Sequence, residues 1–297
     1  MKHDDVSFVS GGVQCRGWHW TGEGDALATE AGRPVVVMAH GLAGTVDSGL
    51  APFAVALAGA GLDVLAFDYR GFGMSDGIPR QTASMEGQLA DYRAAMAAAA
   101  RLPGADPGRL VLWGVSLAGG HVLAAAAHRE DVAAVVSLTP LVDGMAAGRH
   151  ALGHHKPSAM ARSTVLGVRS RIGRPRMMPV VARPGELGAL TLDGCLEDYL
   201  AIAGPTWRNE VDAAVGLELG GHRPGKQAGH VRAPLLVQIA DFDRSAPPRA
   251  AAKAAFAGRA QVRHYPCDHF DVWPGKDWHE AAVRHQVAFL TRELARR

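Results

Sequence analysis

Short runs of β-branched residues alternate with alanine-rich segments along most of this 297-residue chain. The patterns predict buried strands at 34–41, 62–71, 109–114, 132–140, 233–243 and 260–266, and helices at 48–61, 84–101, 116–128, 249–256 and 278–294. Residues 5–20 alternate in the manner of one or two edge strands. Regular alternation of strand and helix predicts an α/β fold with a mostly parallel central sheet and helices on both faces.

The alternation stops near residue 143 and resumes near residue 231. We therefore expect a core formed by 1–142 and 231–297, with 143–230 inserted into it as a helical cap. Hydrophobic residues make up 48% of the chain, which is enough for a sizeable core, but aromatic residues make up only 6%. That core should accordingly be built mainly from small side chains.

Charge and cysteine usage narrow the class of protein. The 31 basic and 29 acidic residues give a net charge of +2, which provides no argument for a nucleic-acid or membrane partner. Cys15, Cys195 and Cys267 are widely spaced and form neither a CxxC pair nor a zinc pattern. Because the first residues lack the apolar region of a secretory signal, we expect a cytoplasmic protein. We also expect no metal, since the cysteines form no zinc pattern, and no organic cofactor.

The segment LVLWGVSLAGGHVL (110–123) places one serine at a predicted strand-to-helix turn. Residues two before and two after Ser116 must be small for so tight a turn, and they are Gly114 and Ala118. Such a turn, a nucleophile elbow, exposes the hydroxyl beside backbone N–H groups at the start of a helix. The sequence therefore predicts Ser116 as a nucleophile.

A nucleophilic serine needs a base and an acid, which follow it in the chain in the order acid, then histidine. The predicted strand at 233–243 ends in ADFD, which offers both Asp241 and Asp243. After the last predicted strand, His269 is the candidate base, whereas His264 falls within that strand. The acid would orient the imidazole that takes the serine proton.

Acyl transfer through a serine also requires donors for the oxyanion. Leu117 N–H, directly after the serine, is one candidate, and Leu42 N–H, in the loop after 34–41, is the other. We expect His40 and Gly41, which open that loop, to contact substrate, with His40 as a buried hydrogen-bonding residue rather than a second base.

These motifs resemble the α/β-hydrolase superfamily over nearly the whole chain. The residues that carry the resemblance are MAHG (38–41), FDYRGFGMSDG (67–77), GVSLAGG (114–120), DFD (241–243) and DHFD (268–271). A closer similarity, in DYRGFGMSDGIPR (68–80), WGVSLAGGHV (113–122), TWRNEV (206–211) and HRPG (222–225), is to a subgroup of fungal polyketide transferases and related bacterial hydrolases. The resemblance implies ester, thioester or carrier-bound acyl substrates, and it places the acid at Asp243. One departure is Asp268, where the family usually has glycine before the catalytic histidine.

The predicted cap has an unusual charge pattern, because residues 144–185 contain eight cations and no acid. The cations are Arg149, Lys156, Arg162, Arg169, Arg171, Arg174, Arg176 and Arg183. They are either the solvated face of an amphipathic helix or a surface that guides an anionic substrate toward the site. Met160 and Val165, from the apolar residues between them, are candidates to line an acyl pocket.

The sequence thus predicts a serine hydrolase of class EC 3.1 that cleaves an ester or thioester through an acyl-enzyme. The same triad would serve an acyltransferase, or an enzyme that eliminates an acyloxy group in a polyketide pathway. A non-catalytic binding protein on the same scaffold is a third hypothesis. The expected partner is a small acyl ester or thioester, with an acyl carrier protein and a homodimer left open.

Overall fold

One eight-stranded sheet forms the centre of the protein. The computed structural model describes residues 1–295, and its central sheet has the strand order β1-β2-β4-β3-β5-β6-β9-β10. The strands are β1 (Asp4–Ser10), β2 (Val13–Trp20), β3 (Arg33–Ala39), β4 (Asp63–Phe67), β5 (Ala105–Val115), β6 (Val132–Leu138), β9 (Leu235–Ala240) and β10 (Gln261–Tyr265). β2 pairs antiparallel with β1 and β4, whereas all pairings from β4 to β10 are parallel. The predicted mostly parallel sheet is confirmed.

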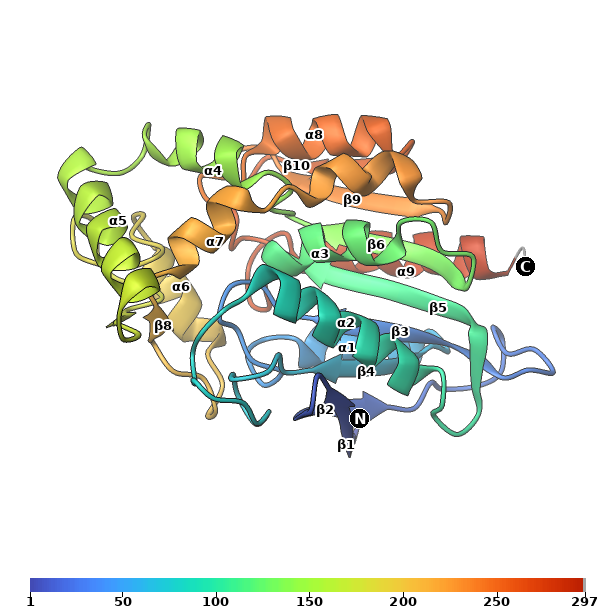
Figure 1. The fold of residues 1–297 in the computed structure, drawn as a ribbon. Helices are drawn as coiled ribbons and strands as arrows, with labels where there is room; N and C mark the ends of the chain where they lie inside the picture. The colour runs from blue at the N-terminus through green and yellow to red at the C-terminus, as the bar shows by residue number, and fades with distance from the viewer. Residues whose placement is uncertain (296–297) are drawn as a thin grey trace.

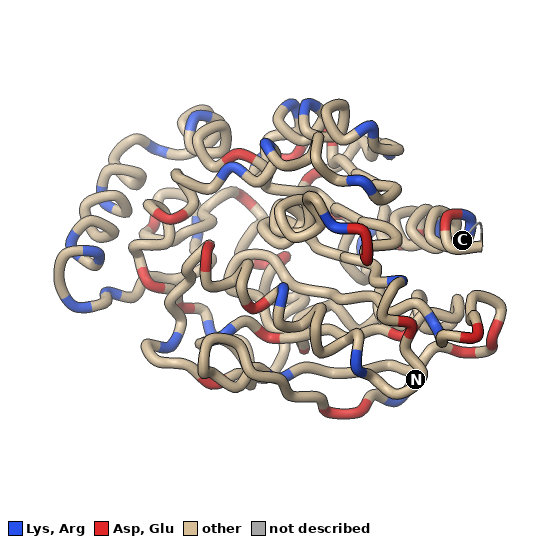
Figure 2. Tube along the Cα trace, turned by 45° about the vertical axis from the view of Figure 1, so that its right-hand side comes forward, with Lys and Arg blue, Asp and Glu red and all other residues tan. Residues whose placement is uncertain are grey.

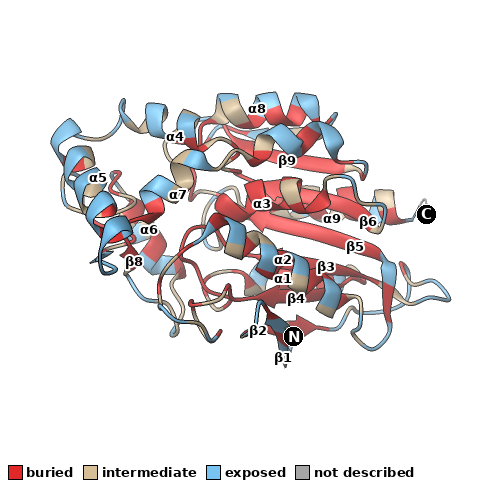
Figure 3. Cartoon of the chain, in the orientation of Figure 1, coloured by how far each residue is buried: buried red, intermediate tan, exposed pale blue. Residues whose placement is uncertain are grey.

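Helices cover both faces of this sheet (Figure 1). In that view α2 (Met85–Ala99), α3 (Leu117–Ala126) and α8 (Pro248–Ala257) lie in front, and α1 (Ala51–Gly59) and α9 (His279–Leu294) lie behind. The inner strands are buried along almost their whole length (Figure 3), because both faces are covered. Within residues 1–295, no helix is long and apolar enough to cross a membrane.

β5 is longer than the predicted strand at 109–114. It begins at Ala105, which pairs with Arg33 before the register shifts toward the Val35–Leu110 pair. The intervening Pro107 and Gly108 are typical of a turn, so the sequence pattern placed the start of the strand after them.

A largely helical segment connects β6 to β9, at the side of the sheet toward which the arrow of β5 points (Figure 1). It contains α4 (Gly144–Ala151), α5 (Pro157–Ile172), β7 (Met177–Met178), α6 (Cys195–Ile202), β8 (Val211–Asp212), α7 (Val215–Gly221) and the 3₁₀ helix η1 (Pro224–His230). β7 and β8 pair antiparallel, and η1 packs against α3 and α8. This segment therefore lies at the carboxyl edge of the parallel strands, where α/β proteins form their ligand sites.

Candidate active site

Ser116 occupies the turn between β5 and α3. It has φ 57° and ψ −117°, a conformation that is strained for a residue with a side chain. Backbone hydrogen bonds tie it to the end of β6 and the loop beyond: Ser116 N–H donates to Leu138 O at 2.9 Å, and Leu141 N–H donates to Ser116 O at 2.9 Å. The turn is therefore fixed by the loop that follows β6, and it keeps the serine side chain clear of the sheet.

Glycines make room for this turn at three places. A Cβ on Gly114 would lie 2.2 Å from Ala118 O, and one on Gly120 would lie 2.2 Å from Leu141 O. A Cβ on Gly41 would lie 2.8 Å from Ser116 Cβ, so the loop after β3 packs directly against the serine. Backbone contact therefore requires glycine at positions 114 and 120, and contact with the serine itself requires it at position 41.

His269 links the serine to a carboxylate. Its Nε2 lies 3.1 Å from Ser116 Oγ, and its Nδ1 lies 2.6 Å from Asp243 Oδ2. His269 follows β10 and Asp243 follows β9, so three loops at the carboxyl edge of the sheet supply the array. Asp241 is not part of it, since its exposed carboxylate pairs with His264 Nδ1 at 2.6 Å.

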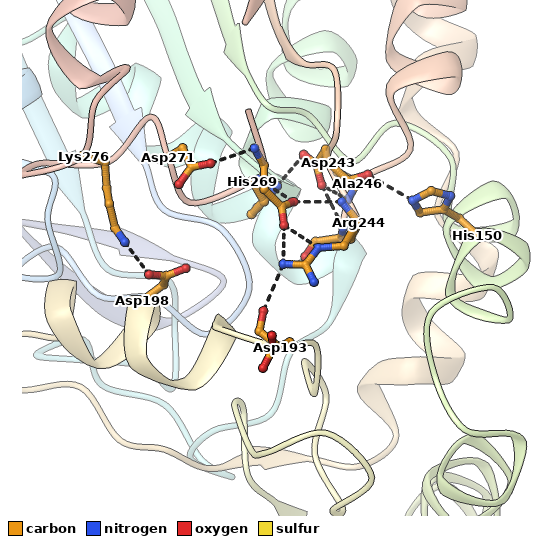
Figure 4. Close-up of polar contacts among 11 residues, drawn as sticks. His150, Asp193, Asp198, Asp243, Arg244, Ala246, His269, Asp271 and Lys276 are labelled. Carbon is orange, nitrogen blue, oxygen red and sulfur yellow. Dashed lines mark hydrogen bonds and ion pairs between the residues drawn. The ribbon is translucent and has the colours of Figure 1, made fainter. Parts of the chain in front are cut away.

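The Asp243 carboxylate is buried and held on both oxygens. Oδ1 accepts hydrogen bonds from the N–H groups of Ser245 at 2.8 Å and Ala246 at 2.6 Å, which leaves Oδ2 for the imidazole. Figure 4 also shows His150, from α4, directed at this loop, where its Nε2 lies 3.0 Å from Asp243 O.

The surroundings of His269 favour its protonated form. Burial alone would lower its pKa, but the charge and hydrogen bond of Asp243, together with the charge of Asp268, raise the pKa above its ordinary value. The neutral imidazole is therefore a stronger base than an ordinary histidine, and once it has taken a proton from a hydroxyl the resulting cation is stabilised.

The two predicted oxyanion donors belong to the residue after Ser116 and to the loop whose Gly41 packs against it. Leu117 is the first residue of α3, and the first N–H groups of a helix have no intrahelical acceptor. Leu42 lies in the loop after β3, and its carbonyl accepts a hydrogen bond from Tyr199 Oη at 2.7 Å, which ties the loop to α6.

His40, in the same loop, is fully enclosed. Its Nε2 lies 2.9 Å from Ser48 O and its ring stacks on Trp273 with centroids 4.9 Å apart. Burial lowers the pKa of His40 to about 4, so this imidazole is neutral at pH 7. These contacts give His40 a role in shaping the loop.

A cavity of about 290 Å³ lies within the segment between β6 and β9. Its walls come mainly from α4, α5 and α7, and include Met160, His155 and Thr191. His155 Nδ1 lies 3.0 Å from Thr191 Oγ1. The lining contains none of Ser116, Asp243 and His269, and Val165 lies instead on the outer face of α5 with 51% of its surface exposed.

The structure adds three residues that the sequence patterns do not single out: His150, Tyr199 and Arg244. Arg244 directly follows Asp243 and pairs with Asp268, which directly precedes His269. Opposite charges directly beside the two predicted site residues were the sequence signal that could have indicated this ion pair. His150 and Tyr199 form hydrogen bonds to backbone carbonyls of the site loops, and no local pattern indicates such contacts. Over the described range, 1–295, no three His, Cys, Asp or Glu side chains form a potential metal site.

The fold and this array define an α/β hydrolase. The sequence profile of the alpha/beta hydrolase fold matches residues 34–276, so the chain belongs to that family.

Within the family, the chain is similar to bacterial and fungal proteins of one subgroup. It is 34% identical over 296 residues to the quorum-quenching protein AidA of Acinetobacter baumannii, covering 97% of this chain and 94% of AidA. It is 34% identical over 142 residues to the thiohydrolase aneE of Aspergillus aculeatus, covering 48% of this chain and 42% of aneE.

GrgF of Penicillium is similar in both sequence and structure. The chain is 31% identical over 144 residues to the polyketide transferase grgF, covering 48% of this chain and 47% of grgF. The crystal structure of the alpha/beta hydrolase GrgF superposes with a TM-score of 0.78 at 22% identity, covering 99% of this chain and 100% of that chain. The expected subgroup, with polyketide transferases and related hydrolases, is confirmed.

Proposed function

We propose that this protein is a serine hydrolase that cleaves a carboxylic ester or thioester through an acyl-enzyme. The observation that carries the proposal is the hydrogen-bonded array of Ser116, His269 and Asp243, at 3.1 Å and 2.6 Å. A serine activated by a histidine, which is oriented by a buried carboxylate, is the arrangement that acyl transfer through serine requires.

In the first half-reaction, Ser116 Oγ attacks the carbonyl carbon as His269 Nε2 takes the hydroxyl proton. The carbonyl electrons move to oxygen, and the N–H groups of Leu42 and Leu117 stabilise that anion. Loss of one such donor typically lowers kcat about 100- to 1,000-fold. Collapse of the intermediate breaks the ester or thioester bond, and His269 returns its proton to the departing alcohol or thiol.

In the second half-reaction, water takes the place of the leaving group. His269 removes one proton from water, and the resulting hydroxide attacks the acyl carbon. The carbon–Oγ bond then breaks and Ser116 regains its proton from His269. Asp243 stays ionised throughout and holds the imidazole with Nδ1 protonated.

The names of the relatives are consistent with acyl substrates. The thiohydrolase aneE supports a thioester as one substrate class. AidA, a quorum-quenching protein similar over nearly the full chain, favours a small signalling molecule with a cleavable acyl bond.

Transfer or elimination is the second candidate, because the local sequence match to a polyketide transferase covers 48% of this chain. The same acyl-enzyme would then react with an alcohol, or the site would release an acyloxy group. Reaction in ¹⁸O-labelled water separates these outcomes, since hydrolysis places label in the acid, transfer gives a new ester, and elimination gives an alkene.

The experiment that tests the proposal measures intact mass after incubation with a fluorophosphonate. The wild type should gain one adduct, and Ser116→Ala should gain none. The control variant Ser158→Ala, which changes an exposed serine on α5, should gain one adduct like the wild type. A panel of p-nitrophenyl esters, lactones and acyl thioesters then defines the substrate class. If the wild type gains no adduct and turns over none of the panel, the proposal fails and a binding protein becomes the better interpretation.

A further inference from the structure

An ion pair joins the two loops that carry Asp243 and His269. Asp268 Oδ2 lies 2.5 Å from both Nε and Nη2 of Arg244, so two guanidinium nitrogens contact the same carboxylate oxygen. Arg244 and Asp268 are 24 residues apart in sequence, and each is the immediate neighbour of a residue of the array. Figure 4 shows Arg244 close to both Asp243 and His269.

Backbone hydrogen bonds converge on the same carboxylate. Asp268 Oδ1 accepts from the N–H of His269 at 2.7 Å and from the N–H of Arg244 at 3.0 Å. The carboxylate thus binds the main chain on both sides of the array as well as the guanidinium. Although burial would raise its pKa, these hydrogen bonds and the Arg244 charge lower the pKa of Asp268 below its ordinary value.

Arg244 also reaches the segment between β6 and β9. Its Nη2 donates to Asp193 O at 3.0 Å, just before α6 begins. One arginine therefore contacts the loop after β9, the loop after β10 and the connecting segment. A lysine has a single terminal nitrogen and lacks the planar geometry for this set of contacts.

Other charged groups near these loops have partners of their own. Asp271 Oδ2 accepts the Asp268 N–H at 2.9 Å, and Lys276 binds Asp198 of α6 at 2.5 Å. His150 contacts the backbone oxygen of Asp243, as described above. The carboxylates that act on the His269 imidazole are therefore Asp243, by direct contact, and Asp268, by proximity.

We propose that Arg244 and Asp268 are positioning residues for the reaction. They hold the loop after β9, which carries Asp243, against the loop after β10, which carries His269, and they balance each other's charge beside the imidazole. This inference rests on the proposed function of Ser116, His269 and Asp243. Neither residue touches the reacting atoms. Their effect reaches substrate only through the placement and basicity of His269.

Charge substitutions that keep the shape of the pair test this role. Asp268→Asn retains an oxygen for the two N–H groups but leaves the Arg244 cation unbalanced, so the pKa of His269 should fall. The acidic limb of the kcat/KM profile should then move to lower pH. Arg244→Gln leaves the Asp268 anion unbalanced, and the same limb should move to higher pH. The double variant should lie between them.

The measurement is kcat/KM against pH for a p-nitrophenyl ester, with unfolding temperature recorded for each variant. Plateau activity of the single variants should fall by up to about 100-fold, because small displacements of catalytic groups are costly. Asp241→Asn is the matched control: this exposed carboxylate lies on the same loop as Asp243 but pairs with His264, so its profile should match the wild type. A purely structural pair would lower stability without opposite shifts, and that result would overturn the inference.

A second readout does not depend on turnover. NMR titration of histidine-labelled protein gives the His269 pKa directly, once its signal is assigned by its loss in His269→Gln. Opposite pKa shifts in the two variants support the inference, and unchanged values refute it. Absence of a fluorophosphonate adduct in the wild type would refute the proposed function instead, so the two failures are distinguishable.

Discussion

Ser116, the proposed nucleophile, has a backbone conformation that costs stability. Its positive φ is a conformation that glycine adopts without strain and that other residues rarely adopt. The backbone around the serine is tightly packed, because three glycines lie against backbone or against the serine itself: Gly41, Gly114 and Gly120. The fold therefore holds the serine in a strained conformation that presents its hydroxyl to His269.

Replacing Ser116 by glycine should accordingly stabilise the protein while removing the proposed nucleophile. We expect Ser116→Gly to raise the free energy of unfolding by about 1 kcal/mol relative to Ser116→Ala, since only glycine relieves the positive φ. Urea denaturation of both variants measures the difference. Equal stability of the two would show that the turn stores no strain.

The candidate site could be predicted from sequence only where the signal is local. Ser116 lies in a short motif whose small neighbours are required by the turn, and His269 follows the last strand. Asp243 and Asp241 both follow the same strand, and spacing alone does not separate them. The pairing of Arg244 with Asp268 depends on contact between two loops, and no periodicity encodes it.

At the scale of elements, close backbone contact fixes α3 against the loop after β6. Gly120 belongs to α3, and a Cβ there would lie 2.2 Å from Leu141 O. A Cβ on Gly216, in α7, would meet no neighbouring atom within 4 Å, so the two helices place different demands on their glycines.

We expect Gly120→Ala to destabilise the protein by about 1–3 kcal/mol, because the added methyl group must displace backbone. Gly216→Ala is the matched control and should be neutral or stabilising by up to about 1 kcal/mol, since alanine favours helices. Thermal unfolding with fluorophosphonate labelling measures both effects. Comparable losses of stability in the two variants would contradict the close contact at Gly120.

α5 presents an unusual outer face. Val165, Val168 and Ile172 lie on the side opposite the buried Ala159 and Gly167, and Ile172 is 80% exposed. Arginines flank this stripe, and Figure 2 shows basic residues gathered along the helix at the edge of the molecule. The sequence predicted the basic character of this segment. It did not predict which side of the helix the apolar residues occupy, because they are irregularly spaced.

Reversing charge on α5 tests whether this face guides substrate. If it does, Arg162→Glu with Arg169→Glu should lower kcat/KM for an anionic acyl ester severalfold at low salt and flatten its salt dependence, because steering acts on encounter. A neutral ester should be unaffected, and Lys253→Glu on the distant α8 serves as control. Unchanged salt dependence would leave the arginines as a solvated face.

At the scale of the whole molecule, two buried histidines form contacts between helices that are far apart in the sequence. His121 of α3 is fully buried, its Nε2 lies 3.0 Å from Gln88 Oε1 of α2, and its ring contacts that of His222, which ends α7. Burial lowers the pKa to about 3 for His121, with the nearby His222 contributing, and to about 4 for His222. Both imidazoles are therefore neutral in the folded protein at pH 7.

This neutrality predicts acid sensitivity. In the unfolded chain these histidines bind protons near pH 6.5, whereas the folded protein resists protonation until about pH 4 or below. Stability should therefore fall as pH decreases from about 6.5 to 4. Urea denaturation across this range should show a smaller loss for His121→Gln than for the wild type or the exposed control His264→Asn. Identical slopes in all three would contradict the prediction.

The order of the strands has a consequence for how such a protein acquires new substrates. β6 and β9 are adjacent in the sheet, with Leu138 paired to Gln238, although about 100 residues of chain separate them. Because these two strands are parallel, the connecting segment leaves the sheet at the carboxyl end of β6 and returns to the amino end of β9 by way of η1. Exchanging the part between α4 and α7 would leave every pairing of the central sheet in place, so the surroundings of the candidate site can diversify around the same array of Ser116, His269 and Asp243.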